Sequence, residues 1–253
     1  MTELRKNISD PVFNLLRYSH LIDLSHAIDP DMPRWPGDPP TEFTTIADGE
    51  IDSFYLRKIS IGEHTGTHIT APITFHPSGR SIDELPAESL IAPGITVDIR
   101  RKTSSNPDYR ISISDLVNWE RKYGPISEGC IVLALTGWSQ KWNNPEKYLG
   151  QNAKRQLHFP GFSLEATHFL LDSRKIHGLG IDTHGIDPGE DNTFSVSKLM
   201  LEEPRIVLAN LTNLHQLPPT GFTLIIGTLK LRGGSGSPAA VLALMSNYPR
   251  SKV

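Results

Sequence analysis

The sequence predicts an α/β protein of layered α+β architecture with a mixed sheet at its core. Apolar runs of strand length outnumber the helical patterns, and the two kinds follow each other irregularly along the chain. That irregular order argues against a strictly alternating barrel. The 20 glycines and 20 prolines are spread through many short loops, as in a fold with frequent turns. We expect one domain over residues 1–253, with residues 1–20 loosely attached and a short helix after Pro11.

Seven apolar runs are predicted to be strands. Several of them are nearly continuous in Val, Ile and Leu, which is typical of strands buried on both faces. The run at 54–61 instead alternates apolar and polar residues. The predicted strands span residues 21–24, 54–61, 95–99, 130–135, 206–208, 222–231 and 239–244.

Three segments carry helical signals. Ser112 or Ser114 can cap a helix that ends at Gly124, and Ser163 can cap a second helix over 164–172. A third helix is predicted over about 196–202, because Pro204 prevents it from continuing.

Composition excludes several classes of protein. With 25 Lys and Arg against 28 Asp and Glu, the formal charge is −3, so the chain lacks the basic excess of a nucleic-acid binder. No stretch approaches the ~20 apolar residues of a membrane helix, and the first residues lack the apolar core of a signal peptide. The single cysteine, Cys130, excludes an intrachain disulfide framework and fits a small buried hydrophobe. We therefore expect a soluble cytoplasmic protein with no membrane partner.

The segment 29–40 contains five prolines and predicts an irregular loop with polyproline character. Trp35 within it is interpreted either as a packing plug or as the lid of a pocket.

Three of the ten histidines, His64, His68 and His76, fall within thirteen residues. The segment is not helical, because Gly66 and several β-branched residues interrupt it. A turn can still bring His64 and His68 together, either as metal ligands or as a structural hydrogen-bonded pair. Neutral imidazole suits Zn²⁺, Mn²⁺ or Fe²⁺, and a catalytic site would need a third ligand.

A second polar cluster spans 180–189 and contains Asp182, His184 and Asp187. It follows a short apolar stretch, so Asp182 is expected at the end of a strand, where site residues are common. The alternative is a turn in which these side chains bond nearby backbone amides. The glycine-rich segment 232–238 lacks the ending of a phosphate-binding loop and is expected to be a hairpin turn or a pocket wall.

Together these residues resemble the cyclase or kynurenine-formamidase-like family of metal-dependent hydrolases. The resemblance runs over about 21–244, and the segment 64–68 is its signature. It is also carried by the segments 23–26, 32–38, 71–72, 136–139, 159–161, 180–183, 210–211 and 236–238, and by Asp187.

The resemblance implies a swivelling β/β/α fold, a homodimer or homotetramer, and hydrolysis of amide or lactone-type bonds in small carbonyl compounds. The family pattern reads His-x-Gly-Thr-His-x-Asp-x-Pro-x-His, in which the first two histidines and the aspartate bind the metal. His64 and His68 match those two histidines, whereas Thr70 stands at the aspartate position and Thr74 at that of the last histidine.

The departures from the pattern rule out a two-metal site of the family type, because Ser197 and Ala209 align with the additional ligands. Either one divalent ion, zinc or manganese, binds at His64 and His68, or none does. The candidates for a third ligand are His76, Asp182, His184 and Asp83.

The resemblance assigns roles to further residues. His76 would act as general acid and base, and Thr70 and Ser197 would bond the reacting substrate. Aromatic and polar residues expected to bind a small aromatic or hydrophobic substrate are Trp35, Phe75, Trp138 and Asp182.

The leading hypothesis is therefore an arylformamidase-like hydrolase. The alternatives are a metal-free cyclase or dehydratase on the same fold, and a paralogue that binds a small molecule without catalysis.

Overall fold

A computed structural model describes residues 18–245 of the chain. The helix predicted after Pro11 lies outside these residues, as does most of the segment 1–20. His20, at the end of that segment, already belongs to the sheet, because β1 (His20–Asp23) pairs with the C-terminal strand.

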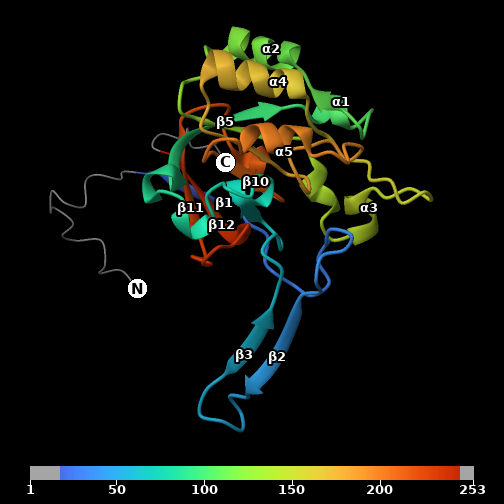
Figure 1. The fold of residues 1–253 in the computed structure, drawn as a ribbon, viewed down its shortest axis with the longest axis vertical. Coiled ribbons are helices and arrows are strands. Elements are labelled where there is room, and N and C mark those ends of the chain that lie inside the picture. Colours follow the sequence, from blue (N-terminus) through green and yellow to red (C-terminus); the bar gives the residue numbers. More distant parts are fainter. Residues whose placement is uncertain (1–17, 246–253) are drawn as a thin grey trace, which may run out of the picture.

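An eight-stranded mixed sheet forms the core (Figure 1), as the sequence predicts. Its order is β1-β12-β11-β5-β7-β9-β10-β4, and a further pairing of β12 with β4 closes seven of the strands into a ring. The pairs β5–β7, β7–β9 and β9–β10 are parallel, and the others are antiparallel. The strands after β1 are β4 (His68–Thr70), β5 (Ile91–Asp98), β7 (Ile131–Leu135), β9 (Gly178–Ile181), β10 (Ile206–Ala209), β11 (Phe222–Thr228) and β12 (Gly236–Met245).

The strand β7 shows why the ring forms. All five of its residues are buried, and successive side chains of a strand point to opposite faces. Ile131, Leu133 and Leu135 pack in the core inside the ring, while Val132 and Ala134 pack in a second core outside it. The continuous apolar run at 130–135 thus has the predicted burial on both faces.

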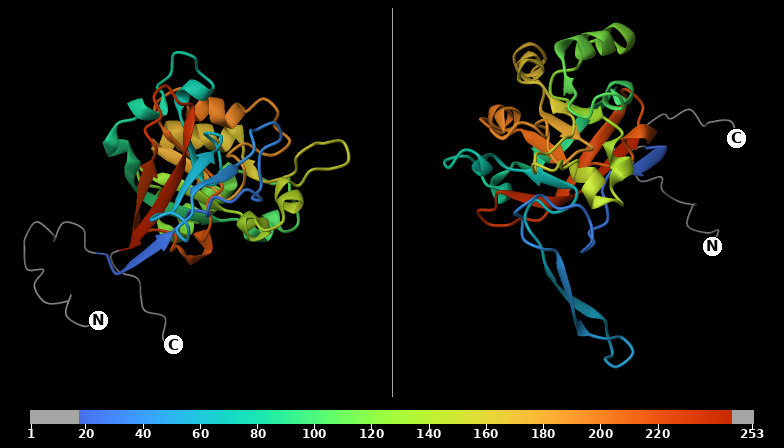
Figure 2. Two further views of the ribbon diagram at one scale, coloured as in Figure 1. Left: turned by 90° about the horizontal axis from the view of Figure 1, so that it is seen from below. Right: turned by 90° about the vertical axis from the view of Figure 1, so that its right-hand side faces the viewer.

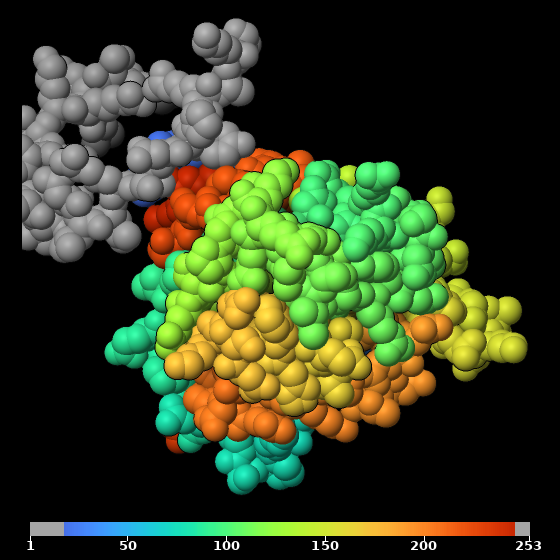
Figure 3. All heavy atoms as spheres, turned by 90° about the horizontal axis from the view of Figure 1, so that it is seen from above, coloured from blue at the N-terminus to red at the C-terminus, as the bar shows by residue number. Residues whose placement is uncertain are grey.

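Three helices cover the outer core. Figure 3 shows this face, with α2 (Ile113–Tyr123), α4 (Leu164–His168) and α5 (Ser195–Met200) side by side. Ser112 and Ser163 cap the first two helices as predicted, and α4 continues into a π-helical turn over Phe169–Ser173. The short helices are α1 (Arg100–Thr103) and α3 (Pro145–Leu149), and the 3₁₀ turns lie at Pro72–Thr74, Ile82–Glu84, Ala87–Leu90, Trp138–Lys141 and Leu214–Gln216.

Two small sheets complete the described chain. The strands β6 (Arg110–Ile111) and β8 (Gly161–Phe162) form a parallel pair beside the helices. The strands β2 (Glu42–Ala47) and β3 (Leu56–Ser60) form an antiparallel ribbon that extends away from the body of the molecule (Figures 1 and 2). We call the segment 42–60 the arm.

All seven predicted strands are present with shifted ends, but β2, β4, β6, β8 and β9 were not predicted. Cys130 is fully buried as expected, and burial raises the pKa of its thiol to about 11. Among residues 18–245, no helix has both the length and the apolar character to cross a membrane.

Candidate active site

A cavity of about 240 Å³ lies beside β4 and brings the two predicted imidazoles together. The ring centroids of His64 and His68 are 5.2 Å apart and the rings are nearly perpendicular, at 84°. Other polar residues that line the cavity are Asp38, Thr70, Thr74, His184, Asp187, Asp191 and Ser197. The third histidine of the cavity is therefore His184, whereas His76 does not line it.

His68 is held in a single tautomer by the loop that precedes it. Its Nδ1 lies 2.9 Å from the Gly66 carbonyl oxygen, to which only a protonated nitrogen can donate, so Nε2 keeps its lone pair. Asn210 Nδ2 donates to the same carbonyl at 2.7 Å, and Thr67 Oγ1 donates to the Asn210 backbone oxygen at 2.6 Å. Asn210 is buried, so these bonds fix the loop against the end of β10.

His64 is held by a carboxylate through a serine. The Ser235 hydroxyl donates to Glu63 Oε2 at 2.5 Å and can therefore only accept from His64 Nε2, at 3.0 Å. This network places the proton on Nε2 and the lone pair on Nδ1. A side chain at Gly236 would collide with the ring, because an added Cβ would lie 2.6 Å from His64 Cε1.

Burial keeps these imidazoles neutral. It lowers the pKa of His64 below 6.5, although the charges of Asp38 and Glu63 oppose that shift. Burial, together with the neighbouring His64, lowers the pKa of His68 to about 3, and burial lowers the pKa of His184 to about 3. Burial also raises the pKa of Asp38, against the opposing effect of His64. The cavity thus holds three neutral bases at pH 7.

His184 carries an unsatisfied nitrogen. Its Nε2 is buried without a hydrogen-bond partner among residues 18–245, and such a group costs about 1–3 kcal/mol. Its ring stands edge-on to Tyr148 at 4.8 Å and to Trp35 at 5.8 Å.

The two hydroxyl residues that the sequence predicts to bond the substrate, Thr70 and Ser197, both line the cavity. Thr70 lies on β4, two residues after His68. The Ser197 hydroxyl donates to Asp187, a buried carboxylate that also accepts from the backbone amides of Val196 and Ser197. The Ser197 proton is therefore already used within the chain.

Aromatic side chains form the wall opposite these groups. Trp35 lies edge-on to Phe159 at 6.2 Å, and Phe75 lies 5.5 Å from Phe194. Phe194 has a left-handed backbone with φ 54°, which costs of order 1–3 kcal/mol in a non-glycine residue and often marks a functional site. Of the predicted substrate-binding residues, Trp35 and Phe75 lie in this wall.

The structure does not place His76 where the predicted general base would stand. The 3₁₀ turn Pro72–Thr74 directs the chain away after Thr74 and Phe75, and His76 Nε2 bonds the Lys198 carbonyl at 2.9 Å. This nitrogen must carry its proton to donate there, which leaves the lone pair on Nδ1, but His76 does not line the cavity.

Three further predicted residues lie outside the cavity lining. Trp138 is buried in a separate aromatic cluster, where its Nε1 donates to the Tyr148 carbonyl at 2.7 Å. Asp182 follows β9 as predicted, but Thr136 Oγ1 and the amides of Thr136 and Gly137 saturate its carboxylate. Asp83 accepts from Ser81 and Gly233. None of them can bind a substrate or a metal in this cavity.

The residues of the cavity do not fit a resident divalent ion. His64 and His68 offer two lone pairs, but a catalytic zinc site takes three protein ligands, and the threonine hydroxyl at position 70 does not replace a carboxylate. The orphaned Nε2 of His184 is the third nitrogen with ligand chemistry. Yet among residues 18–245, no three His, Cys, Asp or Glu donors of this cavity lie within 4.8 Å of one another.

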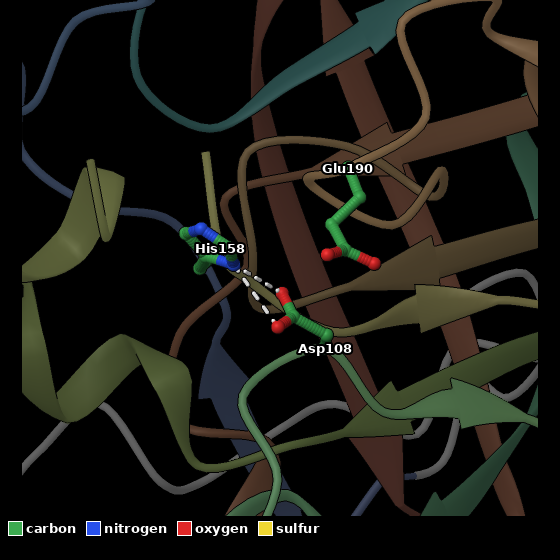
Figure 4. A group of neighbouring side chains, drawn as sticks. All are labelled: Asp108, His158 and Glu190. Atoms are coloured by element: carbon green, nitrogen blue, oxygen red, sulfur yellow. Dashed lines mark hydrogen bonds and ion pairs between the residues drawn. The ribbon is translucent and has the colours of Figure 1, made fainter. Parts of the chain in front are cut away.

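One group elsewhere does satisfy that spacing. Asp108, His158 and Glu190 have ligand atoms within 4.8 Å of one another (Figure 4). His158 Nδ1 lies 2.9 and 3.0 Å from the two Asp108 oxygens and must donate to them, so this nitrogen has no lone pair for a cation. Glu190 instead faces Arg110 at 3.9 Å. We assign these residues to surface ion pairs.

Among the cavity carboxylates, the sequence singled out Asp187 but neither Asp38 nor Asp191 as a site residue, and it missed half of the aromatic wall. Asp38 ends the proline-rich segment 32–38, and that segment was a usable signal because it carries part of the family resemblance. Phe159 likewise begins the segment 159–161 of the resemblance, whereas no local pattern marks Phe194.

Comparisons with known proteins agree with the fold and with the family resemblance. A family model described as "Putative cyclase" matches residues 22–188. Isatin hydrolase of Roseibium aggregatum is 32% identical over 217 residues, which are 82% of each chain. Kynurenine formamidase of Salinibacter ruber is 26% identical over 231 residues, 90% of this chain and 98% of that protein.

Solved structures have the same architecture. Isatin hydrolase A from Labrenzia aggregata, bound to benzyl benzoate, superposes with a TM-score of 0.84 at 33% identity and covers 90% of this chain and 94% of that one. A structure described as a potential metal-dependent hydrolase with cyclase activity gives 0.70 at 25% identity, over 91% and 99%.

Proposed function

Because the chain belongs to the cyclase family, we propose that it hydrolyses an amide or lactone-type bond in a small aromatic or hydrophobic carbonyl compound. Relatives named isatin hydrolase and kynurenine formamidase support the bond type. The observation that carries the proposal is His64, held in one tautomer by Glu63 and Ser235 at an aromatic-walled cavity. Such a wall suits a flat, apolar substrate.

In the proposed reaction, His64 Nδ1 accepts a proton from a water molecule as that water attacks the substrate carbonyl carbon. The carbon–nitrogen or carbon–oxygen bond then breaks, and the imidazolium returns the proton to the leaving atom. Glu63 stabilises the imidazolium through Ser235. General acid–base catalysis of this kind contributes about 10²–10⁴-fold.

Neighbouring groups would orient the reactants. The lone pair of His68 Nε2 can accept the second hydrogen of the attacking water or an N–H of the substrate. The Thr70 hydroxyl can donate to the carbonyl oxygen, where negative charge develops. His184 lies against Trp35 and would accept from a polar substituent of the substrate.

One similar solved structure is described as a potential metal-dependent hydrolase. In a metal-dependent hydrolase, a divalent ion would polarise the substrate carbonyl. The ligands at this cavity do not fit such an ion, so each proposed step uses the chain's own residues.

We further propose that the protein acts in the cytoplasm as a homodimer or homotetramer. The buried, unpaired Cys130 suits a reducing compartment. The exposed apolar arm supports self-association.

The test is a product assay with chelator-treated protein. Isatin and N-formyl arylamines are incubated with wild type, His64→Gln and His76→Gln, and mass spectrometry follows the addition of one water. We expect turnover by wild type and His76→Gln, and its loss in His64→Gln. Ligand-induced thermal stabilisation without product would favour the binding paralogue, and loss of water from a hydroxylated substrate would favour the dehydratase.

A further inference from the structure

A second cavity, of about 890 Å³, lies where strand β11 stops pairing with β5. β11 pairs with the segment Ile91–Gly94, and the remainder of β5 has a strand, β7, on one side only. The cavity lies along this remainder, between α1, α2 and the loop 215–219, on the side of the molecule that carries α1 and α2 (Figure 1). We call it the β5 cavity. It shares no lining residue with the cavity beside β4, so it is a separate place for a ligand.

One lining residue of the β5 cavity has an unused hydroxyl. Thr96 is 5% exposed, and its Oγ1 is buried with no hydrogen-bond partner among residues 18–245. Its backbone is already bonded, because the amide donates to the Pro219 carbonyl at 2.9 Å and the carbonyl accepts from Trp119 Nε1 at 2.8 Å. An unsatisfied buried hydroxyl costs free energy, so a ligand that accepts from it gains a hydrogen bond.

The acidic side chains of the lining are already neutralised by basic ones. Asp98 accepts from Arg100 at 2.7 and 3.0 Å, and buried Asp115 accepts from Lys102. Both pairs line the β5 cavity. These two carboxylates therefore do not need a cationic ligand.

Two further basic side chains of the lining have no acidic partner. Arg101 on α1 and Lys122 on α2 form no ion pair among the described residues, and the Lys122 amino group lies over the Tyr123 ring, 4.9 Å from its centroid. The β5 cavity thus has an excess of positive charge, which attracts an anion.

The neutral part of the lining suits a flat apolar group. Val97, Leu135 and Leu217 contribute apolar side chains. The Tyr123 ring is 40% exposed and lies beside buried Trp119, with ring centroids 5.3 Å apart. An exposed aromatic ring at a cavity can stack on the ring of a ligand.

The anionic group of the ligand is better a carboxylate than a phosphate. Phosphate sites typically supply several backbone amides from a glycine-rich loop or a nest, and no glycine lines the β5 cavity. Its donors are side chains, and a carboxylate needs no more than these.

We propose that the β5 cavity is a second binding site that takes a small aromatic carboxylate. The carboxylate accepts from the Thr96 hydroxyl and is attracted by Arg101 and Lys122, and the ring lies against Tyr123 and the apolar side chains. This site lies beyond the proposed hydrolysis and does not depend on it.

The test is isothermal titration calorimetry of the full chain with naphthoate. Naphthylmethanol has the same ring without the charge, and acetate has the charge without the ring. We expect naphthoate to bind and the other two to bind at least about tenfold more weakly. Inorganic phosphate is titrated as well, and tighter binding of phosphate than of naphthoate would overturn the proposed ligand class.

Variants assign the binding to the β5 cavity. Arg101→Gln should raise the Kd of naphthoate about tenfold. Arg121→Gln is the matched control, because it removes the same charge nearby but Arg121 does not line the cavity. Thr96→Val should also weaken binding without lowering the melting temperature of the free protein, because the hydroxyl has no partner to lose. Circular dichroism verifies that each variant is folded.

Three results would overturn the proposal: no binding of naphthoate by wild type, equal Kd values for Arg101→Gln and Arg121→Gln, or unchanged binding by Thr96→Val. His64→Gln should bind naphthoate as wild type does. Binding that is lost in His64→Gln and kept in Arg101→Gln would place naphthoate in the cavity beside β4 and overturn the proposal too. Because the readout is binding, failure of the hydrolase proposal is separately visible in the product assay.

Discussion

The cavity and the arm differ in what determines their structure. At the cavity, His64 donates to Ser235 and His68 donates to the Gly66 carbonyl, which Asn210 also holds. Along the arm, ten successive residues are exposed and no described strand pairs with its edges. Contacts within the chain thus hold the cavity residues, whereas no described strand outside the arm pairs with β2 or β3. Cavity changes should act on chemistry and stability, and arm changes on association.

The largest effect is expected at the base of the proposed reaction. His64→Gln removes the lone pair that accepts the proton from water and should lower kcat by about 10²–10⁴-fold. Steady-state hydrolysis measures this effect. His76→Gln is the matched control, because His76 bonds the Lys198 carbonyl outside the cavity lining, and an equal loss in that variant would refute the assignment.

A second expected effect is loss of stability in acid. Burial lowers the folded-state pKa of His68 and His184 to about 3 from 6.5. Below pH 6.5 the unfolded chain binds more protons than the native one, so stability falls with pH down to about 3. An unfolded histidine is already half protonated at pH 6.5, so each group contributes about 1 kcal/mol over the next pH unit, hence roughly 2 kcal/mol for the two groups between pH 6.5 and 5.5.

Urea denaturation at both pH values measures that change. His184→Phe cannot titrate, and we expect its ring to stay among Trp35 and Tyr148, so this variant should lose the contribution of His184, about 1 kcal/mol between pH 6.5 and 5.5. An unchanged pH dependence would show that His184 is not buried as a neutral base.

A smaller loss of stability should distinguish alanine substitutions at two asparagines. Both Asn210 and Asn213 have left-handed backbones, with φ 54° and 58°, but the hydrogen bonds of the Asn210 side chain are buried, and that of Asn213 to Asp23 is exposed. Asn210→Ala leaves the Gly66 carbonyl and Tyr148 hydroxyl short of a partner and should cost about 1–3 kcal/mol. Asn213→Ala should cost less than 1 kcal/mol, and equal losses in thermal denaturation would contradict this account.

The sequence predicted the parts of the molecule that local pattern determines. The continuous apolar run of β7 required a strand buried on both faces, and the four-residue spacing of His64 and His68 indicated a site. Strand β9 was missed because two of its four residues are glycines. Close packing requires both, since a Cβ at Gly178 would lie 2.5 Å from the Ile206 carbonyl oxygen and one at Gly180 would lie 2.5 Å from Leu133 Cδ2.

The rest depended on groups that are distant in sequence. Asp182 looked like a site residue at a strand end, but the amides of Thr136 and Gly137, 45 residues or more away, bind its carboxylate. The alternation at 54–61 predicted a strand correctly, yet a pattern within one chain does not tell which molecule covers it.

The account depends most on His64 acting as a base whose pKa is lowered by burial and raised by the charges of Asp38 and Glu63. The most direct measurement is the pH dependence of kcat/KM for hydrolysis by wild type and Glu63→Gln, both treated with chelator. The activity of wild type should fall in acid with a midpoint below 6.5, because burial lowers the pKa of His64. Glu63→Gln removes one of the two carboxylates that raise this pKa, so its midpoint should move to a still lower pH and its reaction should be slower. Identical acid limbs in the two proteins, or activity abolished by the chelator, would contradict the account.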